Sequence, residues 1–172
     1  PLVTCVFYSY FYASLQKNVM ERRILFLLLS IVSSFSLYAY KTEPLSEQIH
    51  TIQVLANGNW ANYPIIELNS NEYIQISFDR IYEGGADRLR YRVIHCNADW
   101  VTSSLSSIEY IDGFNDNLIE DYAYSSGTTM EYTNYQLIIP NNDVRLTVSG
   151  NYTVEIYEED NPDSIMLTAC FS

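Results

Sequence analysis

The chain has 172 residues, of which 48% are hydrophobic and 17% are charged, and it carries a formal net charge of −12 with a pI near 4.3. This length allows one domain with additional segments, and the balance of hydrophobic and charged residues is that of a globular protein rather than a disordered one. The excess of acidic groups argues against binding to nucleic acid or to an anionic membrane surface, because both would repel this chain.

Residues 20–39 have the pattern of a secretory signal peptide. Arg22 and Arg23 provide a basic start, Ile24–Val32 form a short apolar core, and small residues follow it. The apolar core is too short to span a bilayer comfortably. We therefore expect residues 20–39 to direct export and residues 1–19 to be an upstream extension of the gene model. A buried N-terminal helix is the alternative.

The segment that remains after cleavage, residues 40–172, is more acidic than the whole chain. From Lys41 onward it has six basic and twenty acidic residues, which gives a formal charge of −14. It keeps two cysteines, Cys96 and Cys170. Export permits a disulfide between them, but two cysteines do not make a disulfide framework. We expect free cysteines, with a Cys96–Cys170 bridge as the less favoured alternative.

Alternation of apolar and polar residues with a period of two dominates after Ile49 and predicts β-strands. In residues 88–95, for example, Leu89, Tyr91, Val93 and His95 share one face. The regular segments are 73–79, 88–95, 143–149, 151–158 and 164–171, and the less regular ones are 50–55, 63–68, 121–126 and 134–139.

Turn-forming residues separate these segments, notably at 83–87, 140–143 and 158–163. Around nine short strands in roughly 130 residues, with no long helical periodicity after the signal peptide, predict an all-β fold. We expect an immunoglobulin-like antiparallel β-sandwich over residues 40–172.

The stretch "VSGNYTVEIY" adds one detail to this expectation. It is similar to the turn into a strand of immunoglobulin-like domains in which a tyrosine hydroxyl bonds to the backbone upstream. Tyr152 would be that tyrosine, with a plain hairpin tyrosine as the alternative. Val154 stands where antibody domains have a cysteine, so packing rather than a disulfide must join the two sheets.

The stretch "VIHCNADW" places His95, Cys96 and Asp99 within five positions, which suggests a thiol nucleophile or a metal site. Adjacent strand residues point to opposite faces, so His95 and Cys96 diverge. Zinc needs three or four nitrogen or sulfur ligands, and residues 40–172 have two histidines and two cysteines without ligand spacing. We interpret His95 as a hydrogen-bonded core histidine and Cys96 as a small buried apolar residue.

Other polar clusters indicate no reaction either. The loop "DGFNDN" at 112–117 offers oxygen ligands for calcium, but it does not follow the EF-hand order, and a solvated turn is favoured. Pairs of acidic residues are not placed at the separation that a glycosidase needs. We therefore expect no catalytic, cofactor-binding or metal-binding residues and no enzymatic activity.

The pieces "VIHCNADW" and "EYIDGF", in that order and spacing, resemble the amino-terminal domain of the type IX secretion system plug protein family. The similarity covers about residues 48–171, including "NGNWANYPIIEL", "NEYIQISFD", "IEDYAYS" and the region 133–163. The resemblance implies a periplasmic, non-catalytic protein, peripheral to the outer membrane. Family members occlude the periplasmic side of a large outer-membrane translocon when it is not passing substrate.

The resemblance also implies that residues 40–172 are the amino-terminal part of a longer protein, because family members extend beyond this domain. It implies an outer-membrane translocon protein as partner. We expect no nucleic-acid binding, no direct membrane insertion and no small-molecule substrate. Our candidates for the partner contact are Trp100, Tyr110 and Phe114 in the loop 99–118, with core and loop packing as the alternative. From the residues alone, a carbohydrate-binding or accessory β-sandwich module of a secreted enzyme stays open, provided that Trp60, Trp100 and the tyrosines form an exposed face.

Overall fold

The structure, a computed structural model, describes residues 39–82 and 88–172. The proposed upstream extension, all of the expected signal peptide except Ala39, and the expected turn at 83–87 lie outside the described residues. The described strands are β1 (Glu43–Pro44), β2 (Ile49–Ala56), β3 (Ile74–Arg80), β4 (Leu89–Cys96), β5 (Ile111–Gly113), β6 (Asn117–Leu118), β7 (Asp121–Tyr124), β8 (Thr133–Ile139), β9 (Val144–Leu146), β10 (Asn151–Glu158) and β11 (Asn161–Phe171). One short helix, α2 (Ser107–Tyr110), lies between β4 and β5.

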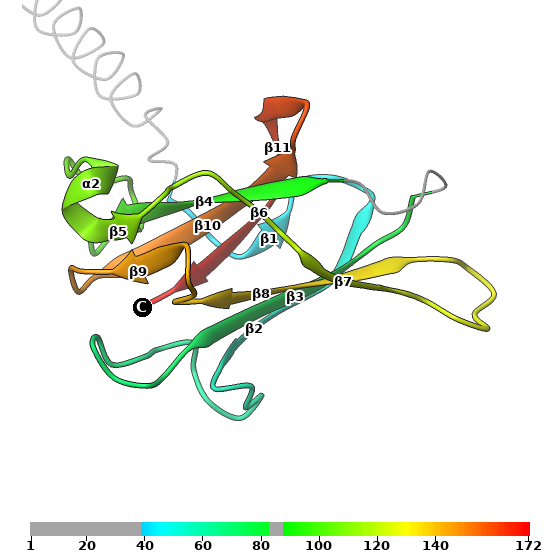
Figure 1. Cartoon of the computed structure of the whole chain (residues 1–172), viewed down its shortest axis with the longest axis horizontal. Helices are drawn as coiled ribbons and strands as arrows, with labels where there is room; N and C mark the ends of the chain where they lie inside the picture. The colour runs from blue at the N-terminus through cyan, green and yellow to red at the C-terminus, as the bar shows by residue number, and fades with distance from the viewer. Residues whose placement is uncertain (1–38, 83–87) are drawn as a thin grey trace, which may run out of the picture. The chain divides into compact units, whose positions relative to one another are not determined.

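The strands form two facing sheets and a small third one, all antiparallel (Figure 1). The five-stranded sheet has the order β1-β11-β10-β4-β6, the four-stranded sheet has the order β2-β3-β8-β7, and β5 pairs with β9. This arrangement confirms the predicted all-β antiparallel sandwich. Its immunoglobulin-like detail stays a prediction, which the pairing of β4, β10 and β11 in one sheet and of β2, β3, β8 and β7 in the other supports.

The core lies between the two main sheets and is formed by the faces that the alternation predicted. Ile74, Ile76 and Phe78 of β3 are buried, and Leu89, Tyr91 and Val93 of β4 face them from the other sheet. Phe78 stacks on Tyr135 of β8 with ring centroids 5.3 Å apart. Burial of such large side chains contributes on the order of 1.5–3 kcal/mol each, which makes this layer the main source of stability.

A buried arginine links the two sheets at one end. Arg80, at the end of β3, is 1% exposed, and its guanidinium donates hydrogen bonds to Gln48 Oε1 at 2.8 and 3.0 Å. The same group donates to Glu158 Oε1, at the end of β10, at 2.6 Å. The ion pair therefore joins the four-stranded sheet to the five-stranded one.

Two predicted details of the second half are present. The Tyr152 hydroxyl donates to the carbonyl oxygen of Val148, four residues upstream. The predicted turn at 158–163 is tighter than expected, because β10 ends at Glu158 and β11 begins at Asn161.

The predicted strand at 63–68 is wrong. Residues 57–73 form a loop between β2 and β3, in which Pro64 has no backbone N–H to donate to a ladder. Four short elements were also missed, namely β1, α2, β5 and β6. Helix α2 is one turn held by a capping box, in which Ser106 N donates to Glu109 Oε2 at 2.7 Å. Elements of two to four residues are too short to display a period.

Within the described residues, no helix combines the length and the apolar character needed to cross a lipid bilayer.

Candidate partner-binding surface

His95 and Cys96 serve the fold rather than a reaction. His95 Nδ1 lies 2.8 Å from Ser103 Oγ, and its ring packs edge-on against Tyr152 with centroids 5.1 Å apart. Cys96 is 1% exposed, as predicted, and its side chain lies on the face of β4 opposite to that of His95. On that face its sulfur lies 3.5 Å from Oγ1 of Thr153 in β10. Burial raises the pKa of the Cys96 thiol, so it stays protonated and weakly nucleophilic at neutral pH.

Cys96 and Cys170 are free, so the disulfide alternative is wrong for this structure. Thr153 of β10 lies between them, with its hydroxyl 3.5 Å from each sulfur. The cysteines belong to β4 and β11, which flank β10, and two strand spacings amount to roughly 9–10 Å. A disulfide needs Cα atoms within about 7 Å.

The three predicted contact residues lie in different environments. Tyr110 is 5% exposed and donates its hydroxyl to the Val93 carbonyl at 3.2 Å, so the expectation that it contacts a partner is corrected: it is a core residue. Trp100 is half-buried in a turn, where its backbone carbonyl accepts from Tyr40 N at 2.8 Å. Phe114 is 78% exposed and remains available to a partner.

The loop 112–117 is tied to the five-stranded sheet rather than solvated throughout. Asn115 acts as a strand partner for Val93, accepting from its N–H at 2.7 Å and donating to its carbonyl at 2.9 Å. Asp116 accepts from Arg90 Nε at 2.6 Å and from the Tyr157 hydroxyl at 2.9 Å. Hydrogen bonding to Arg90 lowers the pKa of the Asp116 carboxyl, so this group is a fixed anion in the fold. Among the described residues, no group of three or more His, Cys, Asp or Glu is arranged to hold a metal ion.

A different loop exposes the largest apolar side chains. Residues 57–73, which we call the aromatic loop, connect β2 to β3 and extend below the four-stranded sheet in Figure 1. In this loop Trp60 is 87% exposed, Tyr63 is 84% exposed and Ile65 is 61% exposed. Three large apolar side chains within six positions form a surface that costs free energy when it faces water.

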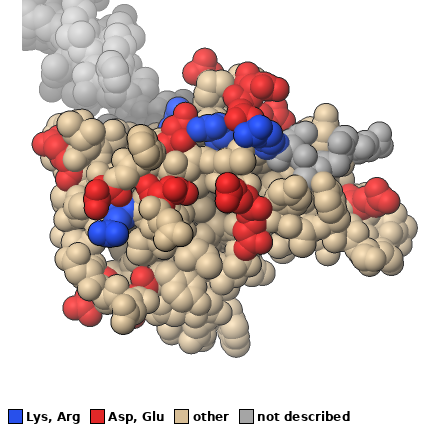
Figure 2. All heavy atoms as spheres, in the orientation of Figure 1, with Lys and Arg blue, Asp and Glu red and all other residues tan. Residues whose placement is uncertain are grey.

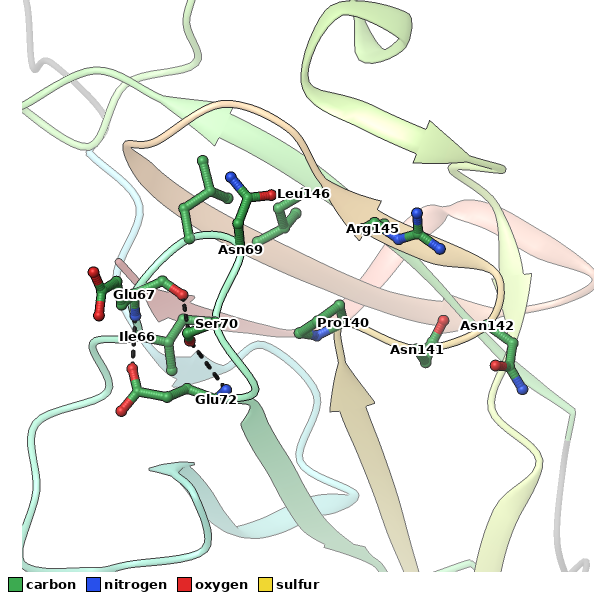
Figure 3. A pocket seen from close by; sticks show the side chains of 11 residues that line it. Ile66, Glu67, Asn69, Ser70, Glu72, Pro140, Asn141, Asn142, Arg145 and Leu146 are labelled. Atoms are coloured by element: carbon green, nitrogen blue, oxygen red, sulfur yellow. Dashed lines mark hydrogen bonds between the residues drawn. The ribbon is translucent and has the colours of Figure 1, made fainter.

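Hydrogen bonds hold the aromatic loop in one conformation. At its base, Asn57 Oδ1 accepts from Tyr73 N at 3.0 Å, and Asn57 Nδ2 donates to Glu72 Oε1 at 3.2 Å. The other Glu72 oxygen accepts from Glu67 N at 2.7 Å, and Ser70 Oγ donates to the Glu67 carbonyl at 2.6 Å (Figure 3). The loop is therefore preorganised by its own side chains.

The middle of the aromatic loop is also fastened to the end of β11. Ser172 N donates to the Pro64 carbonyl at 3.0 Å, and Ile66 N donates to the Ser172 carbonyl at 2.8 Å. Residues 64–66 thus pair with the main chain beyond Phe171, and this pairing fixes the position from which Tyr63 and Ile65 project.

A groove lies beside the aromatic loop (Figure 3). Its cavity of about 490 Å³ lies between the loop and the β8–β9 turn, with Glu67 and Glu72 on one wall and Pro140, Asn141 and Arg145 on the other. A second cavity of about 250 Å³ shares Ile66, Leu68 and Leu146 with the first. The two cavities therefore adjoin along an apolar strip.

The charges of the described residues leave a negative surface. Figure 2 shows basic side chains lying beside acidic ones. Each of the six basic side chains from Lys41 onward has an acidic partner, in the pairs Lys41–Glu43, Arg80–Glu158, Arg88–Glu159, Arg90–Asp116, Arg90–Glu159, Arg92–Glu155 and Arg145–Asp112. Because acidic residues outnumber basic ones, the remaining carboxylates determine the sign of the surface potential.

From the residues, the partner contact was expected in the loop 99–118, and Trp60 entered only the carbohydrate-binding alternative, so the cluster of Trp60, Tyr63 and Ile65 was not predicted as a partner contact. A signal for it was present, since Asn57-Gly58 and Pro64 bracket Trp60 and Tyr63 with turn residues. Aromatic residues inside a turn-rich segment have no alternating face to bury, and this favours exposure over a place in the core.

The family model described as "Type 9 secretion system plug protein 1st domain" matches residues 49–172. A similar solved structure is the crystal structure of a hypothetical protein from Parabacteroides merdae ATCC 43184, with 48% identity and a TM-score of 0.76. The similarity covers 78% of this chain and 34% of that one, so the chain spans about a third of the solved relative. No curated protein matches.

Proposed function

Because the chain belongs to the type 9 secretion system plug protein family, we propose that it is an exported, non-catalytic protein that occludes the periplasmic side of that system's outer-membrane translocon. The observation that carries the proposal is the family match over residues 49–172, nearly the whole described domain. The family is named for a role in secretion rather than for an enzymatic activity.

The described surface is compatible with a protein-binding role. Exposed Trp and Tyr on a preorganised loop are the residue types that dominate protein–protein contacts. The buried thiol of Cys96 and the hydrogen-bonded ring of His95 are engaged in packing. We propose that the partner is an outer-membrane protein of the secretion machinery, and that the contact excludes solutes from its periplasmic opening.

Export is part of this proposal. We propose that residues 20–39 are a cleaved signal peptide, and that residues 40–172 are the amino-terminal β-sandwich of a longer periplasmic protein. N-terminal sequencing of the protein recovered from the periplasm should show a start near Leu37 or Tyr40. Recovery of a periplasmic form beginning at Pro1 would contradict it.

The function is tested by capture from a membrane extract. The exported protein carrying an affinity tag should co-purify with the outer-membrane translocon of the type 9 system, and deletion of residues 40–172 should abolish the capture. Cells that lack the protein should leak small periplasmic solutes through the idle translocon. Absence of the translocon from the captured material would refute the proposal.

A second candidate keeps one observation in its favour. Trp60 and Tyr63 present almost fully exposed rings, as the binding faces of carbohydrate modules do, although Trp100 and several tyrosines are half-buried or buried. A carbohydrate-binding or accessory module of a secreted enzyme would bind a glycan array through these rings. Tight glycan binding without capture of a membrane protein would favour it.

A further inference from the structure

We propose that the aromatic loop is the surface by which this domain docks on its protein partner, and that the partner presents an apolar recess rimmed by lysine and arginine. This inference rests on the proposed function and deepens it, because it names the contact surface and the chemistry of the partner. Trp60 and Tyr63 are the central contacts, and Ile65 extends the apolar area toward the groove.

Two large aromatic side chains of the aromatic loop face solvent. Trp60 and Tyr63 are 87% and 84% exposed, whereas the aromatic rings of Tyr91, Tyr135 and Tyr152 are buried in the core. An indole that faces water on a folded domain gives up the free energy that burial would supply, and a partner that covers it recovers this free energy. Tryptophan and tyrosine are also the residues most enriched among contacts that dominate binding.

The aromatic loop is also preorganised. The loop is fastened at Asn57 and Glu72 by hydrogen bonds of 3.0 to 3.2 Å and at its middle by the Pro64–Ser172 and Ile66–Ser172 bonds of 3.0 and 2.8 Å. A loop already held in one conformation loses little conformational entropy on binding, so more of the contact free energy appears as affinity. Side chains that merely happened to be exposed would not need this support.

Charge specifies the partner. Between Lys41 and Arg80 the chain has five acidic residues and no lysine or arginine. Glu67 and Glu72 lie in the loop itself, and both line the adjoining groove. The basic side chain on the far wall, Arg145, is already paired with Asp112 at 3.5 Å. An apolar centre with an acidic rim is complementary to an apolar recess with a basic rim.

The inference is tested in the complete exported protein with matched variants. Trp60→Ser and Tyr63→Ser remove exposed rings, so each should leave the urea denaturation midpoint unchanged and weaken capture of the translocon by about tenfold or more. Met130→Ser is the control, because Met130 is also exposed, at 60%, in the connection between β7 and β8. It should bind as the wild type does. Glu67→Lys should also weaken binding, and the loss should shrink at high salt.

The outcomes separate the two proposals. Capture by the wild-type protein with equal capture by the Trp60→Ser and Tyr63→Ser variants would overturn the docking surface while leaving the proposed function intact. Failure of the wild-type protein to capture the translocon would overturn both. A lowered denaturation midpoint or faster proteolysis in the Trp60→Ser variant would show that Trp60 packs within its own chain, and this would overturn the inference.

Discussion

Gly150 is expected to be irreplaceable because of the histidine beside it. It immediately precedes β10, has φ +155°, and belongs to the "SGNY" turn that leads into Tyr152. A Cβ built on Gly150 would overlap His95 Nε2 and lie 3.2 Å from Cδ2 of the same ring. Gly150→Ala therefore introduces a steric clash and a backbone conformation that alanine rarely adopts.

The ring of His95 cannot easily move away from the new methyl group. Its Nδ1 is held by Ser103 Oγ at 2.8 Å, and Tyr110 and Tyr152 pack against the ring with centroids 5.6 and 5.1 Å away. Overpacking of this kind costs about 1–3 kcal/mol. The unfavourable φ costs a further amount of about 1–3 kcal/mol. The sum, about 2–6 kcal/mol, is a large part of the roughly 5–15 kcal/mol by which such domains are stable.

Urea denaturation followed by circular dichroism measures this loss, and a double-mutant cycle separates its two causes. In the His95→Ala background the clash is absent, so Gly150→Ala should cost only about 1–3 kcal/mol. Gly127→Ala is a control for the backbone term, because Gly127 has φ +70° and a Cβ there would meet nothing within 4 Å. Equal costs of Gly150→Ala with and without His95, or a cost below about 1 kcal/mol, would refute the reasoning.

Three further predictions concern buried polar groups. Thiol reagents at neutral pH should label Cys96 far more slowly than a free thiol, because it is buried and its pKa is raised; fast labelling of the folded protein would contradict this. Glu158→Gln should lower the free energy of unfolding, measured in urea, by about 1–3 kcal/mol; this is less than for a fully buried pair because the Glu158 side chain is 41% exposed. Arg80→Met removes the buried positive charge together with its need for a counter-ion, so it should lower the free energy of unfolding by less than Glu158→Gln does. Burial raises the pKa values of Tyr152 and Tyr157 to about 12, above the ordinary value of 10.0. The two neutral phenols therefore contribute fully to the stability of the fold below pH 10, and this contribution declines as the pH rises toward 12. Ultraviolet titration should show a group of late-ionising tyrosines that includes Tyr152 and Tyr157, and a stability independent of pH in that range would contradict the assignment.

Strand positions and their buried faces could be predicted from the residues alone. Alternation is a local property, since successive side chains of any strand point to opposite faces. For this reason the alternation put Leu89, Tyr91 and Val93 on one face, and in the structure all three are buried. A bond from the Tyr152 hydroxyl to the upstream backbone was expected from the similarity of "VSGNYTVEIY" to an immunoglobulin-like turn, and the structure gives the Val148 carbonyl as its acceptor.

Short elements and loops depend on segments that are distant in the chain. Strand β1 exists because Glu43 and Pro44 pair with Thr168 and Leu167, which a window on the sequence does not include. The aromatic loop, residues 57–73, forms no named strand, and its middle is positioned by backbone hydrogen bonds to Ser172, more than a hundred positions away. The apolar residues at 63–68 were interpreted as a strand because hydrophobic content alone does not distinguish a buried face from an exposed one.

The candidate surface shows the same division. The negative surface follows from composition alone, since the chain from Lys41 onward has six basic and twenty acidic residues. The divergence of His95 and Cys96 follows from their being neighbours on one strand. The burial of Tyr110 and the exposure of Trp60, in contrast, depend on the packing of distant segments. Both are aromatic residues in connections between strands, and the difference is whether another segment packs over the ring: Val93 and His95 lie against Tyr110, whereas Trp60 is left to solvent.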